Sequence, residues 1–261
     1  MSPEAVGLLV GAGVLAGALG TAGGITSLVS YPALLAVGVA PLPANVVNLV
    51  AVVACWPGTA LASRQELVGT SPILKRGLPV AAIGAGFGAV LLLTTTPGAF
   101  SRVVPFLVAA GSLSLLAQPT LTTAAARLRA HPSRQGSGAP LLDSAGLVLV
   151  VVGLLSVYSG YFGAGSGVLL LVVAMVLLDP GLPRANAIKN MLIGASAVTS
   201  AAVFIVAGPV DWAAVTPLAL GLFTGSLFGP VLARRMPARL VRSTVAALGL
   251  LLAVKLWLRP G

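Results

Sequence analysis

The chain has very few of the side chains that carry out acid–base chemistry. Among its 261 residues it has five acids, one histidine and one cysteine. The acids all fall at segment ends or in loops: Glu4, Glu66, Asp143, Asp179 and Asp211. They offer no carboxylate pair for catalysis and no carboxylate cage for a metal. Because His131 stands alone in a basic stretch, no Ser–His–Asp set can form within an apolar segment. An enzyme is therefore disfavoured, and neither a metal nor a cofactor is expected.

The single cysteine also limits the covalent and metal chemistry of the chain. Cys55 excludes an intramolecular disulfide and a cysteine-based metal cluster. It lies in an apolar run, which predicts a small buried side chain. The start of the chain lacks the basic region of a signal peptide, so we expect the first apolar segment to be kept.

Charged residues are scarce throughout the chain. They make up 8% of it, against 57% hydrophobic residues, and the mean hydropathy is +1.06. Soluble domains usually have about 25% charged residues. The 32 glycines and 19 prolines lie within apolar runs, which membrane helices tolerate. We therefore predict an all-α polytopic protein embedded in the lipid bilayer of the cell (inner or plasma) membrane. Its net charge of +10 fits basic cytoplasmic loops, so no nucleic-acid partner is expected.

The apolar runs divide into five segments in each half of the chain. Several are shorter than the roughly 20 residues that a full span needs. The first half (1–117) contains segments 5–20, 24–39, 44–62, 77–95 and 99–117. The second half (143–261) contains segments 143–159, 163–178, 186–207, 212–233 and 239–258. Residues 118–142 form a basic linker between two predicted transmembrane repeats.

Landmarks recur in the same order in both halves. The pairs with one common spacing are Gly17 and Gly160, Gly20 and Gly163, and Gly24 and Gly167. Asn45 and Asn186 follow with a spacing two residues shorter. The pattern predicts an internal duplication. Because each half has an odd number of segments, the second repeat would enter the membrane from the opposite face, as in many secondary transporters.

Basic residues predict the orientation. If all ten segments cross, one side receives most of the 15 basic residues: Arg64, Lys75, Arg76, Arg127, Arg129, Arg134, Arg184, Lys189, Arg234, Arg235, Arg239 and Arg242. The other side receives Arg102, Lys255 and Arg259. The positive-inside rule then places the linker in the cytoplasm and both termini outside. This holds even if the first two segments of each half are re-entrant hairpins.

Glycine-rich breaks interrupt an apolar segment in each half. Gly23 and Gly24 precede one half-helix, and Gly165, Ser166 and Gly167 precede its counterpart. The freed N–H groups at a half-helix N-terminus favour an anion. We predict that the two breaks meet and bind one anion, with Ser27 nearby. The alternative is close helix packing, which accounts well for the series Gly221, Gly225 and Gly229.

Asparagine pairs follow each break. Asn45 and Asn48 in one half, and Asn186 and Asn190 in the other, are spaced to share a helix face. Their amides can donate to an oxyanion, although Asn45 and Asn186 also suit helix N-caps. Lys189 either attracts an anion or adds to the positive-inside bias. Trp56, Trp212 and Trp257 are interpreted mainly as interfacial anchors.

These motifs, in this order, resemble the TauE/SafE family of sulfite and organosulfonate exporters. The similarity rests on three stretches and covers nearly the whole chain outside the linker: Gly23-Gly24 through Pro32-Ala-Leu-Leu, the turn from Gly38 to Asn45, and Gly181-Leu-Pro-Arg-Ala-Asn186. The resemblance implies an inner-membrane permease for small sulfur-containing or carboxylate anions, usually moving outward. By position, the two breaks and the two asparagine motifs match the family pattern, although the first break has fewer glycines than expected.

The sequence thus predicts a secondary transporter that exports small sulfur-containing oxyanions, such as sulfite or organosulfonates, by alternating access between inverted repeats. Two alternatives stay open: a passive anion channel and a permease for small carboxylates. If transport is coupled to protons, the proton would travel on the substrate or through Asp179. A homo-oligomer is compatible with the sequence.

Overall fold

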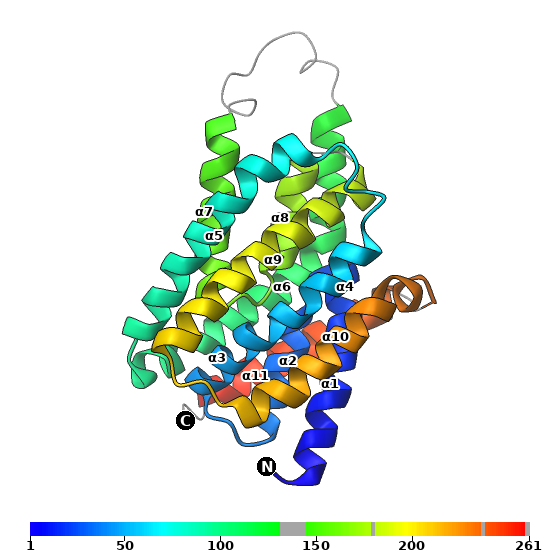
Figure 1. Ribbon diagram of the computed structural model, residues 1–261. Coiled ribbons are helices and arrows are strands. Elements are labelled where there is room, and N and C mark those ends of the chain that lie inside the picture. Colours follow the sequence, from blue (N-terminus) through cyan, green and yellow to red (C-terminus); the bar gives the residue numbers. More distant parts are fainter. Residues whose placement is uncertain (131–144, 179–180, 236–237, 259–261) are drawn as a thin grey trace.

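The computed structural model describes residues 1–130, 145–178, 181–235 and 238–258. Within these ranges the secondary structure is helical throughout (Figure 1). The first half contains α1 (Pro3–Gly23), α2 (Thr26–Ala36), α3 (Pro41–Ala51), the 3₁₀ turn η1 (Val52–Ala54), α4 (Cys55–Ala62), α5 (Ser71–Thr94) and α6 (Pro97–Ala130). The second half contains α7 (Ala145–Tyr161), α8 (Ser166–Val173), the π turn η3 (Ala174–Leu178), α9 (Leu182–Ala207), α10 (Trp212–Arg235) and α11 (Ala238–Leu258).

The helices follow the predicted apolar segments, and many apolar side chains face outward. In the described residues, six helical stretches are long and apolar enough to cross a membrane, and four others are shorter. Ile83, Phe87, Leu154 and Leu251 are each at least 60% exposed. Water-soluble monomers rarely show so much apolar surface, whereas lipid accepts it. The chain is a polytopic membrane protein.

Helix α6 is longer than predicted. It continues past residue 117 to Ala130, so the first part of the predicted linker is helical. Proline at positions 105 and 119 does not end it, as is common in membrane helices, where neighbouring groups satisfy the freed carbonyls. His131, Arg134 and Asp143 lie outside the described residues.

Helices α3 and α9 contact each other in the interior of the bundle. Every residue of α3 from Ala44 to Ala51 is buried, and α9 has buried residues along most of its length. Both begin with a proline in the first turn, where its missing N–H costs nothing. These two helices carry the predicted asparagine motifs into the core.

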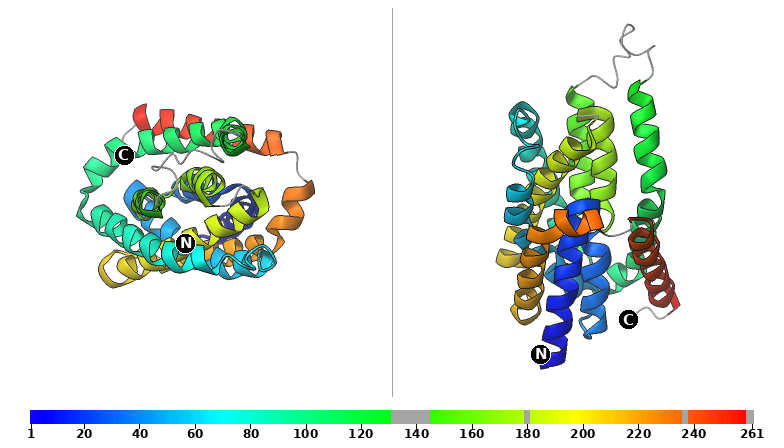
Figure 2. Two further views of the ribbon diagram at one scale, coloured as in Figure 1. Left: turned by 90° about the horizontal axis from the view of Figure 1, so that it is seen from above. Right: turned by 90° about the vertical axis from the view of Figure 1, so that its right-hand side faces the viewer.

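Two helical hairpins approach the middle of the bundle from opposite ends. Helix α1 rises from the end that holds the N-terminus, and α2 folds back beside it, whereas α7 and α8 form the counterpart at the other end (Figures 1 and 2). Gly24 ends α1 with a φ of 72°, and Gly163 and Gly165 turn the chain between α7 and α8 with φ of 79° and 78°. Only glycine adopts these left-handed conformations readily, which explains why both turns are glycine-rich.

Each hairpin packs against a long helix of the other half. Helix α1 packs along α10, and α7 packs along α5. Both contacts are made backbone to backbone: a Cβ added at Gly221 would lie 2.3 Å from the Val10 carbonyl, and one added at Gly88 would lie 2.0 Å from the Val157 carbonyl. The close packing predicted for Gly221 and Gly225 is therefore confirmed. The surroundings of Gly229 lie outside the described part.

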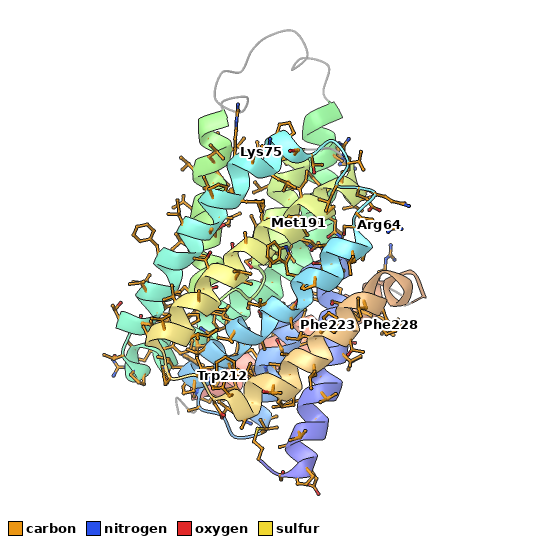
Figure 3. The ribbon with its side chains drawn as sticks, viewed as in Figure 1. Arg64, Lys75, Met191, Trp212, Phe223 and Phe228 are labelled. Carbon is orange, nitrogen blue, oxygen red and sulfur yellow. The ribbon has the colours of Figure 1, made fainter. Side chains whose placement is uncertain are left out.

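Two basic residues lie near one end of the bundle. Arg64 and Lys75 lie near the end where α6 finishes and α7 starts, and Trp212 lies toward the other (Figure 3). An Arg184 guanidinium nitrogen donates to the Val68 carbonyl at 3.0 Å, which ties the start of α9 to the α4–α5 loop. Which end faces the cytoplasm stays a prediction.

Candidate functional site

The two glycine breaks touch each other at the centre of the bundle. A Cβ added at Gly24 would lie 2.8 Å from the Gly167 Cα, and one added at Gly167 would lie 2.6 Å from the Gly24 Cα. No side chain separates the two backbones. The start of α2 and the start of α8 are thereby brought to one place from opposite halves of the chain.

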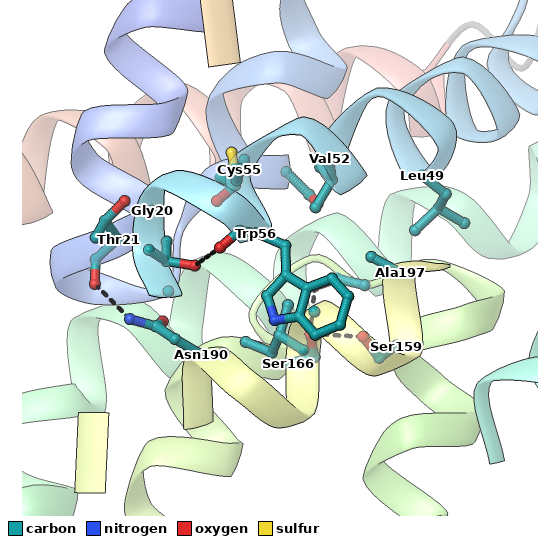
Figure 4. A pocket seen from close by; sticks show the side chains of 18 of the residues that line it. Gly20, Thr21, Leu49, Val52, Cys55, Trp56, Ser159, Ser166, Asn190 and Ala197 are labelled. Carbon is teal, nitrogen blue, oxygen red and sulfur yellow. Dashed lines mark hydrogen bonds between the residues drawn. The ribbon is translucent and has the colours of Figure 1, made fainter. Parts of the chain in front are cut away.

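A small cavity of about 60 Å³ lies beside this contact (Figure 4). Its walls come from both hairpins and from α3, η1, α4 and α9. None of the described residues that line it is charged. The polar ones carry hydroxyl, amide or indole groups: Thr21, Thr26, Ser27, Trp56, Thr59, Ser159, Ser166, Asn190 and Ser200. Since about 10–15 Å³ of the space that a water-sized sphere can occupy holds one water molecule, the cavity has room for a ligand of several heavy atoms.

Five of the predicted site residues line this cavity, and the other six lie behind its wall. Those at the wall are Gly24, Ser27, Ser166, Gly167 and Asn190. Those outside the lining are Gly23, Asn45, Asn48, Gly165, Asn186 and Lys189. The structure thus brings five of the eleven residues to one cavity, and the sequence pattern did not distinguish these five from the other six.

Asn45 and Asn186 each hold the end of a broken helix from the opposite half. The Asn45 amide donates to the Tyr161 carbonyl at 2.8 Å, where α7 ends. The Asn186 amide donates to the Thr21 carbonyl at 3.2 Å, near the end of α1. The last carbonyls of a helix have no partner within it, so buried ends need donors from outside. The N-cap interpretation of both residues is wrong, because the N-caps of α3 and α9 are Ala40 and Gly181.

Asn48 is fully buried and bonded on both sides. Its amide oxygen accepts a hydrogen bond from the Ser30 hydroxyl, and its amide nitrogen donates to the Ser27 oxygen at 3.0 Å. A hydroxyl that accepts such a bond has its own hydrogen left to donate. Asn48 therefore orients Ser27, which lines the cavity.

Lys189 is fully buried and bonds to the asparagine motif rather than lining the cavity. Its ammonium donates to the Asn186 amide oxygen at 2.7 Å. Because an ammonium can only donate, it fixes the oxygen of that amide on its own side. The Asn186 nitrogen is then turned toward Thr21. Neighbouring Asn190 also donates toward the Thr21 carbonyl, at 3.4 Å.

The sequence interpretation of Trp56 was wrong. Trp212 and Trp257 are 53% and 65% exposed, as expected of interfacial residues. Trp56 lines the central cavity instead, and its indole nitrogen is buried without a hydrogen-bond partner in the protein. The apolar run around Trp56 did not indicate that its side chain faces the cavity. The 3₁₀ turn η1, which precedes α4, is not evident from the sequence.

Three further predictions concern the cysteine, a possible proton carrier and metal binding. Cys55 is buried as predicted, with its sulfur 3.6 Å from the Leu222 carbonyl. Asp179, the residue considered for proton movement, lies outside the described residues. Across the described ranges, no three His, Cys, Asp or Glu side chains cluster in a way that could hold a metal ion.

Comparisons with known proteins agree with the membrane fold. Residues 5–256 match the family model "Sulfite exporter TauE/SafE". The chain is 26% identical over 257 residues to the probable membrane transporter protein YfcA of Escherichia coli K12, covering 98% of this chain and 91% of that protein. It is 28% identical over 254 residues to the probable membrane transporter protein ORF9 of a Sinorhizobium species, covering 95% and 91%. No solved structure matches. The match over nearly the whole length shows that the chain belongs to the TauE/SafE family of membrane transporters.

Proposed function

We propose that the protein is a secondary transporter that exports small sulfur-containing oxyanions, such as sulfite or organosulfonates. The observation that carries the proposal is the cavity at the contact of Gly24 with Gly167, where two half-helices begin beside hydroxyl, amide and indole groups. Half-helix N-termini and neutral donors favour an anion. The family description, which names sulfite export, supports the same substrate class.

The packing of the helices supports inverted repeats. Helix α1 corresponds to α7 in the other half, and α10 corresponds to α5. The α1–α10 contact is therefore the counterpart of the α7–α5 contact, and glycines lie at both. Asn45 on the Tyr161 carbonyl and Asn186 on the Thr21 carbonyl correspond in the same way. In this proposal α1–α2 and α7–α8 are re-entrant hairpins from opposite membrane faces. Alternating access then follows from rocking one half against the other around the central cavity.

The charge of the anion and the size of the cavity limit which substrates are expected. An anion leaving a cell whose interior is negative gains about 2.3 kcal/mol per charge for each 100 mV. Export therefore needs no carboxylate relay in the cavity, and none of its described wall residues is acidic. The volume of about 60 Å³ suits sulfite or the head group of a sulfonate.

The test is a flux panel in proteoliposomes with sulfite, thiosulfate, sulfoacetate, taurine and simple carboxylates. We expect sulfite or a sulfonate to move fastest. Asn190→Ala, which alters the cavity wall, and Asn48→Ala, which releases Ser27, should each lower that flux about tenfold or more. Ser114→Ala is the matched control, because the Ser114 hydroxyl bonds only within α6.

Three results would contradict parts of this proposal. Normal flux by both asparagine variants would remove the cavity from the transport path. Carboxylates moving to the exclusion of sulfur oxyanions would reassign the substrate. Counterflow distinguishes a carrier from a channel, since trans-stimulated exchange requires alternating access, whereas very fast flux without exchange indicates a passive pore.

A further inference from the structure

The central cavity contains one donor group that the asparagine and glycine motifs do not explain. Trp56 comes from α4, directly after the η1 turn, and its indole extends across the cavity (Figure 4). Its backbone carbonyl accepts the Thr59 hydroxyl at 2.9 Å, which fixes the start of this short helix. The indole itself projects into the cavity, which residues of both halves line.

The indole N–H has no partner within the protein, although the nitrogen is buried. Buried indole nitrogens usually donate a hydrogen bond, because leaving the donor unpaired costs free energy. The indole donates only and accepts nothing. A ligand that satisfies it must therefore present an acceptor such as an oxyanion oxygen.

Most other hydroxyls around the cavity have already given their hydrogen to a backbone carbonyl. Thr21 donates to Gly17, Ser166 donates to Gly163, and Ser200 donates to Ser196. Ser27 instead accepts a hydrogen bond from the Asn48 amide, so its own hydrogen is left to donate. Side-chain donors that can meet a ligand are therefore few, and the Trp56 indole is one that cannot turn into an acceptor.

A glycine on α9 makes room for the indole. A Cβ added at Gly194 would lie 2.0 Å from Cδ1 and 2.2 Å from Nε1 of Trp56. The five-membered ring therefore lies directly against the Gly194 backbone, and any side chain there would displace it. Gly194 makes room for a side chain, whereas the glycines between α1 and α10 make room for the backbone of another helix.

We propose that Trp56 is a specificity-determining substrate contact: its indole N–H donates to an oxygen of the transported oxyanion, and Gly194 keeps the ring in position. This inference rests on the proposed transport function. It assigns oxyanion recognition to a donor fixed in orientation, and it predicts that an anion with several acceptor oxygens, such as sulfite, binds better than a halide.

The first test is binding by intrinsic fluorescence. In a Trp212→Phe, Trp257→Phe background, Trp56 is the sole indole, and the two removed ones lie on the surface. Titration of the detergent-purified chain with sodium sulfite should change the Trp56 emission saturably, whereas sodium chloride at equal ionic strength should not. An emission that sulfite leaves unchanged while the same chain still transports sulfite would overturn the proposal and leave the transport function intact.

The second test removes the N–H but keeps an aromatic ring. Trp56→Phe should raise the sulfite concentration for half-maximal flux about tenfold or more, as expected for loss of a hydrogen bond to a charged group. Trp212→Phe, at an exposed position, is the control and should behave as the wild type. Gly194→Ala should shift the Trp56 emission in the single-tryptophan background and weaken sulfite transport in parallel. Wild-type half-saturation in Trp56→Phe would overturn the proposal, whereas an absence of flux for every anion in the wild type would count against the transport function.

Discussion

At the scale of single residues, the site depends on neutral amides that reach across the chain. Asn45 and Asn186 satisfy carbonyls at the ends of α7 and α1, each from the opposite half. A membrane interior supplies no water for these carbonyls, so the donors must come from protein. The ends of the broken helices are therefore stabilised by the partner half as well as by their own glycine turns.

Replacing Asn45 with alanine should destabilise the protein measurably. The change leaves the Tyr161 carbonyl without its 2.8 Å donor. Polar bonds between membrane helices contribute about 0.6 kcal/mol on average, and a buried carbonyl left unpaired raises the cost to about 1–3 kcal/mol. The midpoint of thermal unfolding in detergent should fall by several degrees, while Ser114→Ala should leave it unchanged. A midpoint equal to that of the wild type would argue against the capping role.

The residue types of the site could be predicted, but their partners could not. Glycine breaks and asparagines have recognisable spacing, and the structure brings both breaks together. The partner of Asn186, by contrast, lies 165 positions away in sequence, and no local pattern encodes it. Trp56 was misread for a related reason: tryptophan in apolar sequence usually marks an interface, and only the tertiary fold turns this one inward.

At the scale of helices, glycine sets the distance between the two halves. Gly13 and Gly17 face α10, where added Cβ atoms would lie 2.6 Å and 2.4 Å from backbone carbonyl oxygens. Gly7 and Gly11, on the same helix, have nothing within 4 Å of an added Cβ. One helix therefore carries glycines with two different roles, and only the packing separates them. The positions of the helices could be predicted from the apolar runs. The two roles of the glycines could be assigned only from the packing in the structure.

A pair of substitutions on α1 tests this distinction. Gly17→Ala should destabilise the protein by about 1–3 kcal/mol, because the methyl group meets the Leu222 backbone, which cannot move aside without shifting α10. Gly11→Ala should be neutral or slightly stabilising, since alanine favours the helix more than glycine does. Thermal unfolding of both variants in one detergent provides the comparison. Equal effects of the two changes would contradict the assigned contact.

At the scale of the whole molecule, a few labelled residues allow the orientation in the membrane to be predicted. Arg64 and Lys75 lie near one end, and the exposed Trp212 lies toward the other (Figure 3). The positive-inside rule predicts that the first end faces the cytoplasm. The proposed inverted repeats require this orientation to hold for both halves at once.

Cysteine labelling on intact cells tests the orientation. The exposed positions Gln65, between α4 and α5, and Thr96, between α5 and α6, lie on successive loops at opposite ends of α5. A membrane-impermeant maleimide should label Thr96→Cys and leave Gln65→Cys unlabelled until the cells are opened. The native Cys55 is buried and provides the background signal. The reverse pattern would place the basic end outside.

If the proposed site binds the substrate, the contact of Gly24 with Gly167 limits how the protein can acquire a new one. Because the two backbones meet with no side chain between them, neither position can accept a bulkier residue without forcing the halves apart. Divergence in substrate range is therefore directed to the surrounding hydroxyls and to the Trp56–Gly194 pair. A laboratory evolution experiment that selects for a new anion should gather its mutations there and leave both glycines unchanged.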